Sequence, residues 1–547
     1  MTSNIEKKTK QLIDDLKSTC GSYGLGNDGN EYKIITQIFL YKFINDKFGY
    51  EVKNYDTPYR DRIRNARSWD EALKTLTEEE YEDLLEYSGL PESSPKLKQE
   101  HFISTIYNQQ NKGDFASLLD ATLVDLGNFN ASIFSVKTAN KTSITLFENI
   151  TTAVPDPAQR DDFARALISR LANFNFEEVF SQKYDFFATI FEYLIKDYNK
   201  DGGGKYAEYY TPHSVATIMS RLLVKPDEDI KSVSCYDPSA GSGTLLMSIA
   251  HAIGEDRCTI YSQDISQKSS KMLRMNLILN NLVHSIHNVI QGDTLVSPYH
   301  ENEDGTLKHF DYIVSNPPFK LDFSDNQAAL SAKTDRFWAG VPNIPKTKKD
   351  SMAIYLLFLQ HIMNSLSERG KAAVVIPTGF ITAKSGIEKK IRERMVEKKM
   401  IAGVVSMPSN IFATTGTNVS VLFLDRGNTS DEVVLIDASK LGVTIKEDGN
   451  QRTKLERADE DKIVNAFHSR EAIDDFSVVV SYDEIKEKGY SFSAGQYFDI
   501  KIEYTEITAD EFKSKMADHK KSLSSLFAES AQLEKDIMNH LDSLHYE

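Results

Sequence analysis

The amino-acid sequence predicts an α/β protein, in which a doubly wound sheet domain follows a helical domain and precedes a helical tail. Two observations support this fold class. From about residue 230 to residue 426, short β-rich runs alternate with helical stretches, as in proteins with parallel sheets. The β-rich runs are almost continuously apolar, which is typical of strands buried on both faces. The regions on either side show helical periods instead.

Residues 1–195 are predicted to form the helical domain. The stretch EYKIITQIFLYKFINDKFGYEV, from residue 31, has apolar side chains too dense for a surface helix, so we expect a buried one. No catalytic motif stands out here, and a packing or interaction role is expected. The break KDYNKDGGGKY, with Gly202–Gly204, predicts a connector or loop, and residues 196–480 are assigned to the sheet domain.

The sheet domain contains seven predicted strands. They are SVSCYD (232–237), TIYSQD (259–264), NVIQGD (288–293), FDYIVSN (310–316), KAAVVIP (371–377), IAGVVSMP (401–408) and VSVLFLDR (419–426). The first four runs end in Asp or Asn. Because ligands bind at the carboxyl ends of the strands in such folds, these four side chains are expected to lie together.

A glycine turn and three acidic residues predict a nucleoside pocket. YDPSAGSGTLL follows the first strand, and Gly241 and Gly243 permit a tight turn with close ligand approach. Asp237 disfavours a phosphate and favours a cation such as a sulfonium. Asp264 is placed to accept hydrogen bonds from ribose hydroxyls, and Asp293 from an adenine amino group. Each acid alone is typical of a turn, but the three together predict a site for S-adenosylmethionine.

The fourth strand ends in the sequence Asn316-Pro317-Pro318-Phe319. Two prolines fix φ twice and make the residues before them extended, so a rigid loop is the simplest interpretation. The chemical interpretation is that the Asn316 side-chain oxygen and the Pro317 carbonyl accept hydrogen bonds from one exocyclic amino group. Phe319 would then stack on the ring that carries this group.

The combination of DPSAGSG with NPPF resembles the amino-group DNA methyltransferases, which modify adenine N6 or cytosine N4, and its Asn is more typical of the adenine enzymes. AEYYTPHSVATIM (207–219), PSNIFATTGTNVSVLFLDR (408–426) and SFSAGQYFD (491–499) extend the resemblance. Their order is similar to that in the modification subunit of type I restriction-modification systems. The resemblance covers nearly the whole chain and is strongest from about 205 to 426.

The resemblance implies a Rossmann-like, S-adenosylmethionine-dependent methyltransferase that acts on a flipped-out adenine and protects host DNA from restriction. It implies double-stranded DNA as substrate and a specificity subunit flanked by two modification subunits, with a restriction or translocase subunit as a further candidate. Two alternatives stay open. One is methylation of another amine, such as cytosine N4, RNA guanine N2 or protein glutamine. The other is a non-catalytic scaffold of the same fold.

The residues and the resemblance together define the candidate site. The catalytic motif would be Asn316, Pro317, Pro318 and Phe319, and Phe319 and Phe412 would stack on the two faces of the base. The cofactor-binding residues would be Glu208, Tyr209, Tyr210, Thr211, Pro212, His213, Asp237, Ser239, Gly241, Ser242, Gly243, Thr244, Asp264 and Asp293. No metal site is predicted.

Net charge and the carboxyl-terminal segment predict protein partners. The charge of −16 is unusual for a chain that binds DNA alone, so a partner is expected to supply much of the phosphate contact. The insert 331–350 is locally basic and suits either DNA contact or a solvated loop. Residues 481–547 form the last segment, in which Thr508 and Glu511 predict a helix start.

The terminal helix carries an apolar stripe with coiled-coil-like spacing. Its members are Phe512, Met516, Leu523, Leu526, Leu533, Ile537, Leu541 and Leu544. A helix folded back on its own domain is one interpretation, and a seam for a partner helix is the favoured one. The three cysteines show no metal-binding or disulfide spacing, and no apolar run is long enough to span a bilayer. A cytoplasmic protein without membrane contact is therefore expected.

Overall fold

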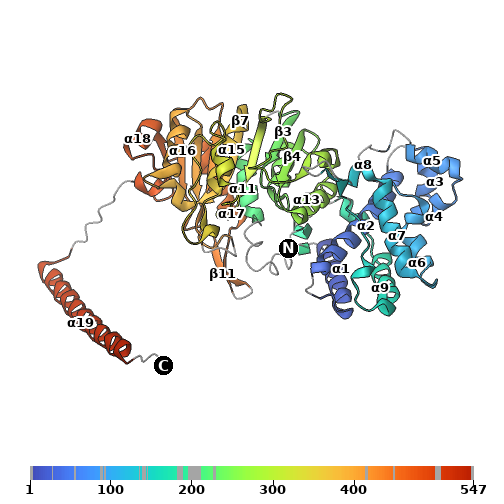
Figure 1. Ribbon diagram of the computed structural model, residues 1–547, viewed down its shortest axis with the longest axis horizontal. Coiled ribbons are helices and arrows are strands. Elements are labelled where there is room, and N and C mark those ends of the chain that lie inside the picture. The colour runs from blue at the N-terminus through green and yellow to red at the C-terminus, as the bar shows by residue number, and fades with distance from the viewer. Residues whose placement is uncertain are drawn as a thin grey trace. The chain divides into compact units, whose positions relative to one another are not determined.

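The computed structural model describes residues 4–26, 29–54, 57–86, 90, 94–134, 136–137, 143–144, 146–181, 189–191, 193–194, 211–225, 230–412, 417–447, 450–498 and 507–543. The chain divides into two compact units, Met1–Tyr497 and Phe498–Glu547 (Figure 1). Within the described ranges, no helix has both the length and the apolar character needed to cross a membrane.

The amino-terminal region is mainly helical. Its helices are α1 (Asn4–Ser22), α2 (Gly29–Asn54), α3 (Arg60–Arg64), α4 (Trp69–Lys74), α5 (Glu78–Glu86), α6 (Ile103–Asn108), α7 (Phe115–Phe129), α8 (Ala131–Phe134) and α9 (Arg160–Ala172), with short 3-10 turns η1 (Gln99–His101), η2 (Thr151–Ala153), η3 (Pro157–Gln159) and η4 (Glu177–Ser181). Two-residue strands β1 (Val136–Lys137) and β2 (Ser143–Ile144) pair antiparallel. As the dense apolar pattern predicts, α2 buries side chains around most of its circumference.

A nine-stranded sheet forms the centre of the larger unit, in the order β13-β10-β8-β9-β7-β6-β3-β4-β5. Its strands are β3 (Val233–Asp237), β4 (Cys258–Asp264), β5 (Val289–Gln291), β6 (Phe310–Ser315), β7 (Leu366–Pro377), β8 (Ile401–Ser406), β9 (Val419–Asp425), β10 (Glu432–Asp437) and β13 (Ser477–Ser481). All seven predicted strands are present. However, β9 runs antiparallel to β7 and β8, and no described helix separates β8 from β9 as parallel neighbours usually require.

Helices lie between the strands along the chain, and several of them pack on the sheet. They are α11 (His213–Leu223), α12 (Thr244–Ile253), α13 (Gln267–Leu279), α14 (Gln327–Ser331), α15 (Tyr355–Asn364), α16 (Gly386–Glu397), α17 (Arg457–Ser469) and α18 (Tyr482–Glu487), with 3-10 turns η7 (Val283–Asn288), η8 (Lys349–Ser351), η9 (Thr378–Ile381) and η10 (Ala494–Gln496). In a separate two-stranded sheet, β11 (Val443–Glu447) pairs antiparallel with β12 (Asn450–Lys454).

The sheet winds outward from its middle in two directions. From β3 the chain passes through α12 to β4 and through α13 to β5, moving toward one edge. From β6 it passes through α15 to β7, moving toward the other edge. Because crossovers between parallel strands are right-handed, this reversal places α12 and α13 on one face and α15 on the opposite face. The predicted doubly wound α/β fold is confirmed.

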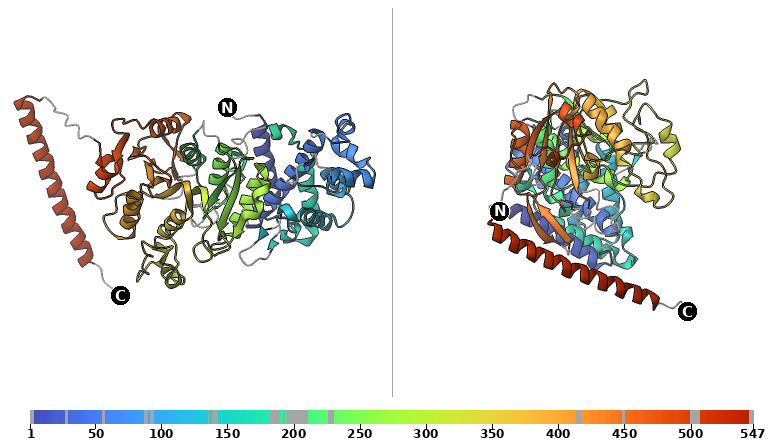
Figure 2. Two further views of the ribbon diagram at one scale, coloured as in Figure 1. Left: turned by 90° about the horizontal axis from the view of Figure 1, so that it is seen from above. Right: turned by 90° about the vertical axis from the view of Figure 1, so that its left-hand side faces the viewer.

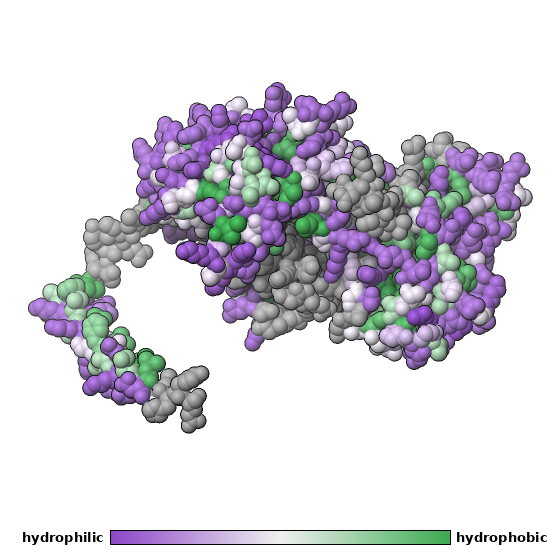
Figure 3. Space-filling view, viewed as in Figure 1, coloured by the Kyte–Doolittle hydropathy of each residue, from purple (hydrophilic) through white to green (hydrophobic). Residues whose placement is uncertain are grey.

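The smaller unit contains one long helix, α19 (Ala509–Asp542). Thr508 caps it as predicted: the Glu511 N–H donates to the Thr508 hydroxyl oxygen (3.2 Å), and the Glu511 carboxylate accepts from the Thr508 N–H (2.9 Å). Figure 2 shows an uninterrupted helix, and Figure 3 shows hydrophobic residues along it beside polar ones. No described residue of α19 is buried.

Candidate active site at the strand ends

The candidate site lies where the winding direction of the sheet reverses. β3 and β6 are parallel neighbours, and the chain leaves their carboxyl ends toward opposite faces of the sheet. A crevice at such a switch point is the usual ligand position in doubly wound folds. Asp237 ends β3, and Asn316 directly follows β6. The reversal therefore brings the first predicted cofactor acid close to the predicted catalytic amide.

A pair of serines joins the two strand ends. The hydroxyl oxygens of Ser239 and Ser315 lie 2.7 Å apart. Asp237 is 1% exposed, and its Oδ1 accepts a hydrogen bond from the Ser239 N–H (2.9 Å). Burial raises the pKa of Asp237 to about 7, against the lowering effect of hydrogen bonds from Ser239 and Ser315. A buried carboxylate that is hard to ionise favours a positively charged ligand beside it.

The glycine turn between β3 and α12 requires glycine at its last position. Gly241 and Gly243 have φ values of +52° and +83°, where a side chain is strained. A Cβ on Gly243 would lie 2.0 Å from Leu273 Cδ1 on α13. The Asn276 side chain donates to the Ser242 carbonyl (3.2 Å), and the hydroxyl oxygens of Ser242 and Thr244 are 3.3 Å apart. The turn is thus held against α13 at the start of α12.

Asp264 and Asp293 border this turn from the neighbouring strand ends. Asp264 is half-buried, and its two carboxylate oxygens accept from the N–H groups of Gly241 (2.9 Å) and Ser266 (2.8 Å). Burial raises the pKa of Asp264. Each oxygen keeps a lone pair for a further donor, as the predicted ribose contact requires. Asp293 accepts from two N–H groups through Oδ1 alone, those of Leu295 (2.9 Å) and Val296 (3.0 Å).

Asn316 is positioned by a residue more than a hundred positions earlier. Its Nδ2 donates to the Thr211 hydroxyl oxygen (3.1 Å), and the two side chains are 7% and 4% exposed. Pro212 precedes α11, which begins at His213. The bond to Thr211 uses one of the two N–H donors of the amide and leaves Oδ1 for a ligand. The predicted residues Glu208, Tyr209 and Tyr210 lie outside the described residues.

The two predicted stacking rings differ in exposure. Phe319 is half-buried, and its ring meets the Tyr355 ring edge-on, with centroids 6.4 Å apart. Phe412 is 6% exposed within the main hydrophobic core, against which Phe319 also packs. Pro317 is buried and Pro318 half-buried between Asn316 and Phe319. Phe319 therefore presents more open surface to a base than Phe412 does.

Several residues that support the site had no recognised signal in the sequence. Thr294 donates its hydroxyl to the Pro238 carbonyl (2.7 Å), and Arg336 donates to the carbonyls of Thr294 and Leu295 (both 2.7 Å). Lys333 donates to the Val296 carbonyl (2.7 Å). Two cations of the basic insert thus bind the chain's own backbone, whereas its lysines at 346, 348 and 349 are exposed.

The strand order and the site define a class: the chain has a Rossmann-like, doubly wound fold of the kind found in methyltransferases. The sequence pattern of the N-6 DNA methylase family matches residues 182–506, which is more than half of the chain. The protein belongs to this family, as the motifs predicted.

Relatives and solved structures agree with this assignment. The type I restriction enzyme MpnII methylase subunit of Mycoplasma pneumoniae is 25% identical over 532 residues, 92% of this chain and 91% of that one. The MjaIX methylase subunit of Methanocaldococcus jannaschii is 26% identical over 71% of this chain and 68% of its own. The crystal structure of a type I methyltransferase subunit from Streptococcus thermophilus superposes with a TM-score of 0.70 at 25% identity, covering 90% of this chain and 100% of that one.

Proposed function

We propose that the protein is a site-specific DNA adenine-N6 methyltransferase and the modification subunit of a type I restriction-modification complex, which protects host DNA from restriction. The observation that carries the proposal is the fixed Asn316 amide. Its donor end binds Thr211 (3.1 Å), its acceptor end is left for a ligand, and it lies at the switch point next to the acid-lined strand ends. The similarity to type I methylase subunits over 92% of the chain supports the assignment to such a complex.

The strand-end residues fit S-adenosylmethionine. The buried Asp237 carboxylate suits a cationic ligand, and the free lone pairs of Asp264 suit the ribose hydroxyls. Asp293 keeps Oδ2 for the adenine amino group, and Thr211, Pro212 and the turn from Ser239 to Thr244 would border the methionine part. When bound, this cofactor supplies an electrophilic methyl group.

The catalytic motif orients and polarises the target amine. Asn316 Oδ1 and the Pro317 carbonyl accept the two N–H groups of adenine N6, which raises the electron density on nitrogen. Phe319 stacks on the base, which must leave the duplex to reach the site. The side chains thus contribute mainly orientation and electrostatics.

Site recognition is assigned to a separate specificity subunit. The net charge of −16 leaves the chain poorly suited to holding DNA alone. The apolar face of α19 offers a seam for a partner helix. Two modification subunits would flank one specificity subunit, and a restriction subunit is a further partner.

The test is to combine the full chain with its specificity subunit, S-adenosylmethionine and unmethylated DNA, and to identify methylated nucleosides by mass spectrometry. We expect N6-methyladenine. Formation of N4-methylcytosine would move the substrate assignment to the cytosine enzymes. Absence of any methylated nucleoside, with the complex intact and the cofactor bound, would favour the non-catalytic scaffold.

A further inference from the structure

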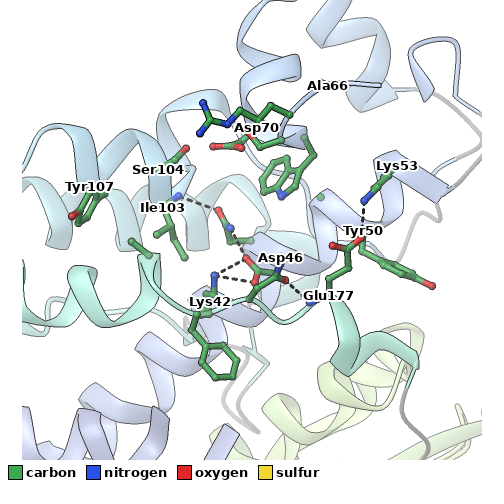
Figure 4. A pocket seen from close by; sticks show the side chains of 18 of the residues that line it. Lys42, Asp46, Tyr50, Lys53, Ala66, Asp70, Ile103, Ser104, Tyr107 and Glu177 are labelled. Atoms are coloured by element: carbon green, nitrogen blue, oxygen red, sulfur yellow. Dashed lines mark hydrogen bonds and ion pairs between the residues drawn. The ribbon is translucent and has the colours of Figure 1, made fainter. Parts of the chain in front are cut away.

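The helical amino-terminal region contains a pocket of about 500 Å³ that takes no part in the proposed methyl transfer. Its walls come from α2, the stretch from Ile63 in α3 to Asp70 in α4, α6 and the segment 172–177. The volume lies in the range of small-molecule sites. Figure 4 shows Lys42, Asp46 and Glu177 along one side, Asp70 and Ser104 along the other, and Tyr107 and Tyr50 at opposite ends.

The floor of the pocket is a buried ion pair with one donor to spare. Lys42 is 5% exposed, and its Nζ lies 3.0 Å and 2.9 Å from the two carboxylate oxygens of Asp46. Asp46 also accepts from Asn45 Nδ2 (2.8 Å) and the Phe176 N–H (2.9 Å), so its acceptor capacity is largely used. An ammonium has three N–H donors, and one carboxylate engages at most two of them. The Lys42 ammonium therefore keeps a donor for a ligand acceptor.

One wall of the pocket is the indole ring of Trp69, which packs against two other aromatic rings. The Trp69 ring meets the rings of Phe102 and Phe48 edge-on, with centroid distances of 5.0 Å and 6.2 Å. Helix α2 approaches so closely that a Cβ on Gly49 would lie 2.3 Å from Trp69 Cε2. Trp69 is half-buried and lines the pocket, so part of its ring is open to a ligand. A fixed aromatic face suits stacking with a planar base.

The rim of the pocket has a cation available to a ligand, whereas its carboxylates already have partners within the chain. Arg67 is exposed, and among the described residues its guanidinium has no hydrogen bond or ion pair. Glu177 already pairs with Lys53 (2.7 Å), and Asp70 is hydrogen-bonded by Ser68 and Ser104. Among the charged groups that line the pocket, those with a donor to spare are thus two cations, and they lie in the same pocket as an aromatic ring. That combination favours an anionic ligand with a planar ring.

We propose that this pocket binds a nucleotide, with its base stacked on Trp69 and a phosphate held by Arg67 and Lys42. The site is distinct from the strand-end site and does not depend on the function proposed above. The nucleotide is either free or one unit of a DNA strand, and the experiment separates these two sources.

The sequence has only two tryptophans, Trp69 and Trp338. In the full-length Trp338→Phe variant, indole fluorescence reports on Trp69 alone. This variant is titrated with deoxyadenosine 5′-monophosphate, deoxyadenosine or a short single-stranded oligonucleotide. S-adenosylhomocysteine is present throughout, so that it occupies the strand-end site. We expect saturable quenching. Quenching by the mononucleotide identifies a free nucleotide, and quenching by the oligonucleotide alone identifies a DNA strand.

Adding Arg67→Gln should weaken binding of the phosphate-bearing ligand about tenfold and leave that of deoxyadenosine unchanged. Arg170→Gln is the matched control, because Arg170 is half-exposed on α9 and outside the pocket. Absence of quenching by every nucleotide overturns the proposal. Equal effects of Arg67→Gln and Arg170→Gln also overturn it. Methylation is not the readout, so failure here leaves the methyltransferase proposal untouched.

Discussion

The strand-end site and helix α19 hold their functional groups in opposite ways. At the site, Asp237 and Asn316 are 1% and 7% exposed, and hydrogen bonds within the chain fix each of them. On α19, Leu526 and Leu533 are 59% and 55% exposed. A buried polar group costs free energy unless it is hydrogen-bonded, and an exposed apolar stripe gains free energy when another surface covers it. The site is thus assembled by hydrogen bonds within the chain, whereas the α19 stripe gains free energy only when another surface covers it.

The extent of the α19 stripe supports this contrast. At 100° per residue, the exposed apolar side chains fall within an arc of about 140° on one side of the helix. They are Phe512, Met516, Leu523, Leu526, Phe527, Leu533, Ile537, Met538 and Leu541, whereas the predicted member Leu544 lies outside the described residues. A stripe of this width matches the core-facing surface of a helix in a bundle.

The largest expected effect is the loss of methylation in Asn316→Ala. Removing one preorganised polar contact to the reacting group lowers the turnover rate about 100-fold or more. Cofactor affinity should change little, because Asn316 is assigned to the base and not to the cofactor. Tritium transfer to DNA measures the first quantity and calorimetry the second. Unchanged turnover would contradict the role assigned to Asn316, because an amide held in place by Thr211 would then take no part in the chemistry.

The next effect concerns the α19 stripe. Leu526→Asp with Leu533→Asp should weaken the complex with the specificity subunit tenfold or more, since each leucine contributes roughly 1.5–3 kcal/mol when buried. Co-purification and titration measure the loss. Ser525→Asp with Gln532→Asp is the control, because these residues have the same spacing on the opposite face of the helix. Equal loss in the two double variants would contradict a partner seam.

The fold and the strand-end positions were accessible from sequence because they depend on local patterns. Apolar runs predicted all seven strands, and their polar ends predicted which side chains would gather. The direction of β9 was not predictable in this way, because an apolar run reports burial and not strand polarity. The bond between Asn316 and Thr211 joins distant segments, and no local pattern encodes it.

The pocket in the helical amino-terminal region was even less predictable from local sequence patterns. Its residues come from four separate segments, and none forms a motif by itself. The one local signal is Lys42 with Asp46, two opposite charges at i and i+4 inside a helix otherwise dense in apolar residues. Charged side chains in such a helix must be paired, but the sequence does not show which cavity they border.

A smaller effect is the pH dependence of cofactor binding. The pKa of Asp237 is about 7, raised from the ordinary 3.8 by burial. A cationic ligand prefers the carboxylate, so affinity should fall as pH decreases below about 7, by up to tenfold per pH unit. The stability of the ligand-free protein depends on pH with the opposite sign. The folded state binds the proton on Asp237 more tightly than the unfolded state does, because its pKa is higher. The resulting contribution of Asp237 to the free energy of unfolding is lost as pH rises from about 4 through about 7.

Calorimetry with S-adenosylmethionine at pH 8 and pH 6 measures how cofactor affinity depends on pH. The Asp237→Asn variant should show affinity that changes little with pH. Affinity that is independent of pH in the unmodified protein would show that Asp237 is not beside the cationic part of the ligand. The buried acid would then hold the turn through the Ser239 N–H and would not bind the cofactor.

The smallest effect tests how α19 is held at its start. Thr508→Ala removes the hydroxyl that accepts from the Glu511 N–H (3.2 Å), which costs about 1 kcal/mol of helix stability. No described residue of α19 is buried, so packing does not mask this loss. Hydrogen exchange in the full chain should become about fivefold faster in the first turn, while Thr508→Ser keeps the cap. Binding of the specificity subunit to α19 should then reduce the difference in exchange rate between the two variants, because a helix held by a partner depends less on its own cap. Equal exchange in the two variants without a partner would mean that the cap contributes nothing to an exposed helix.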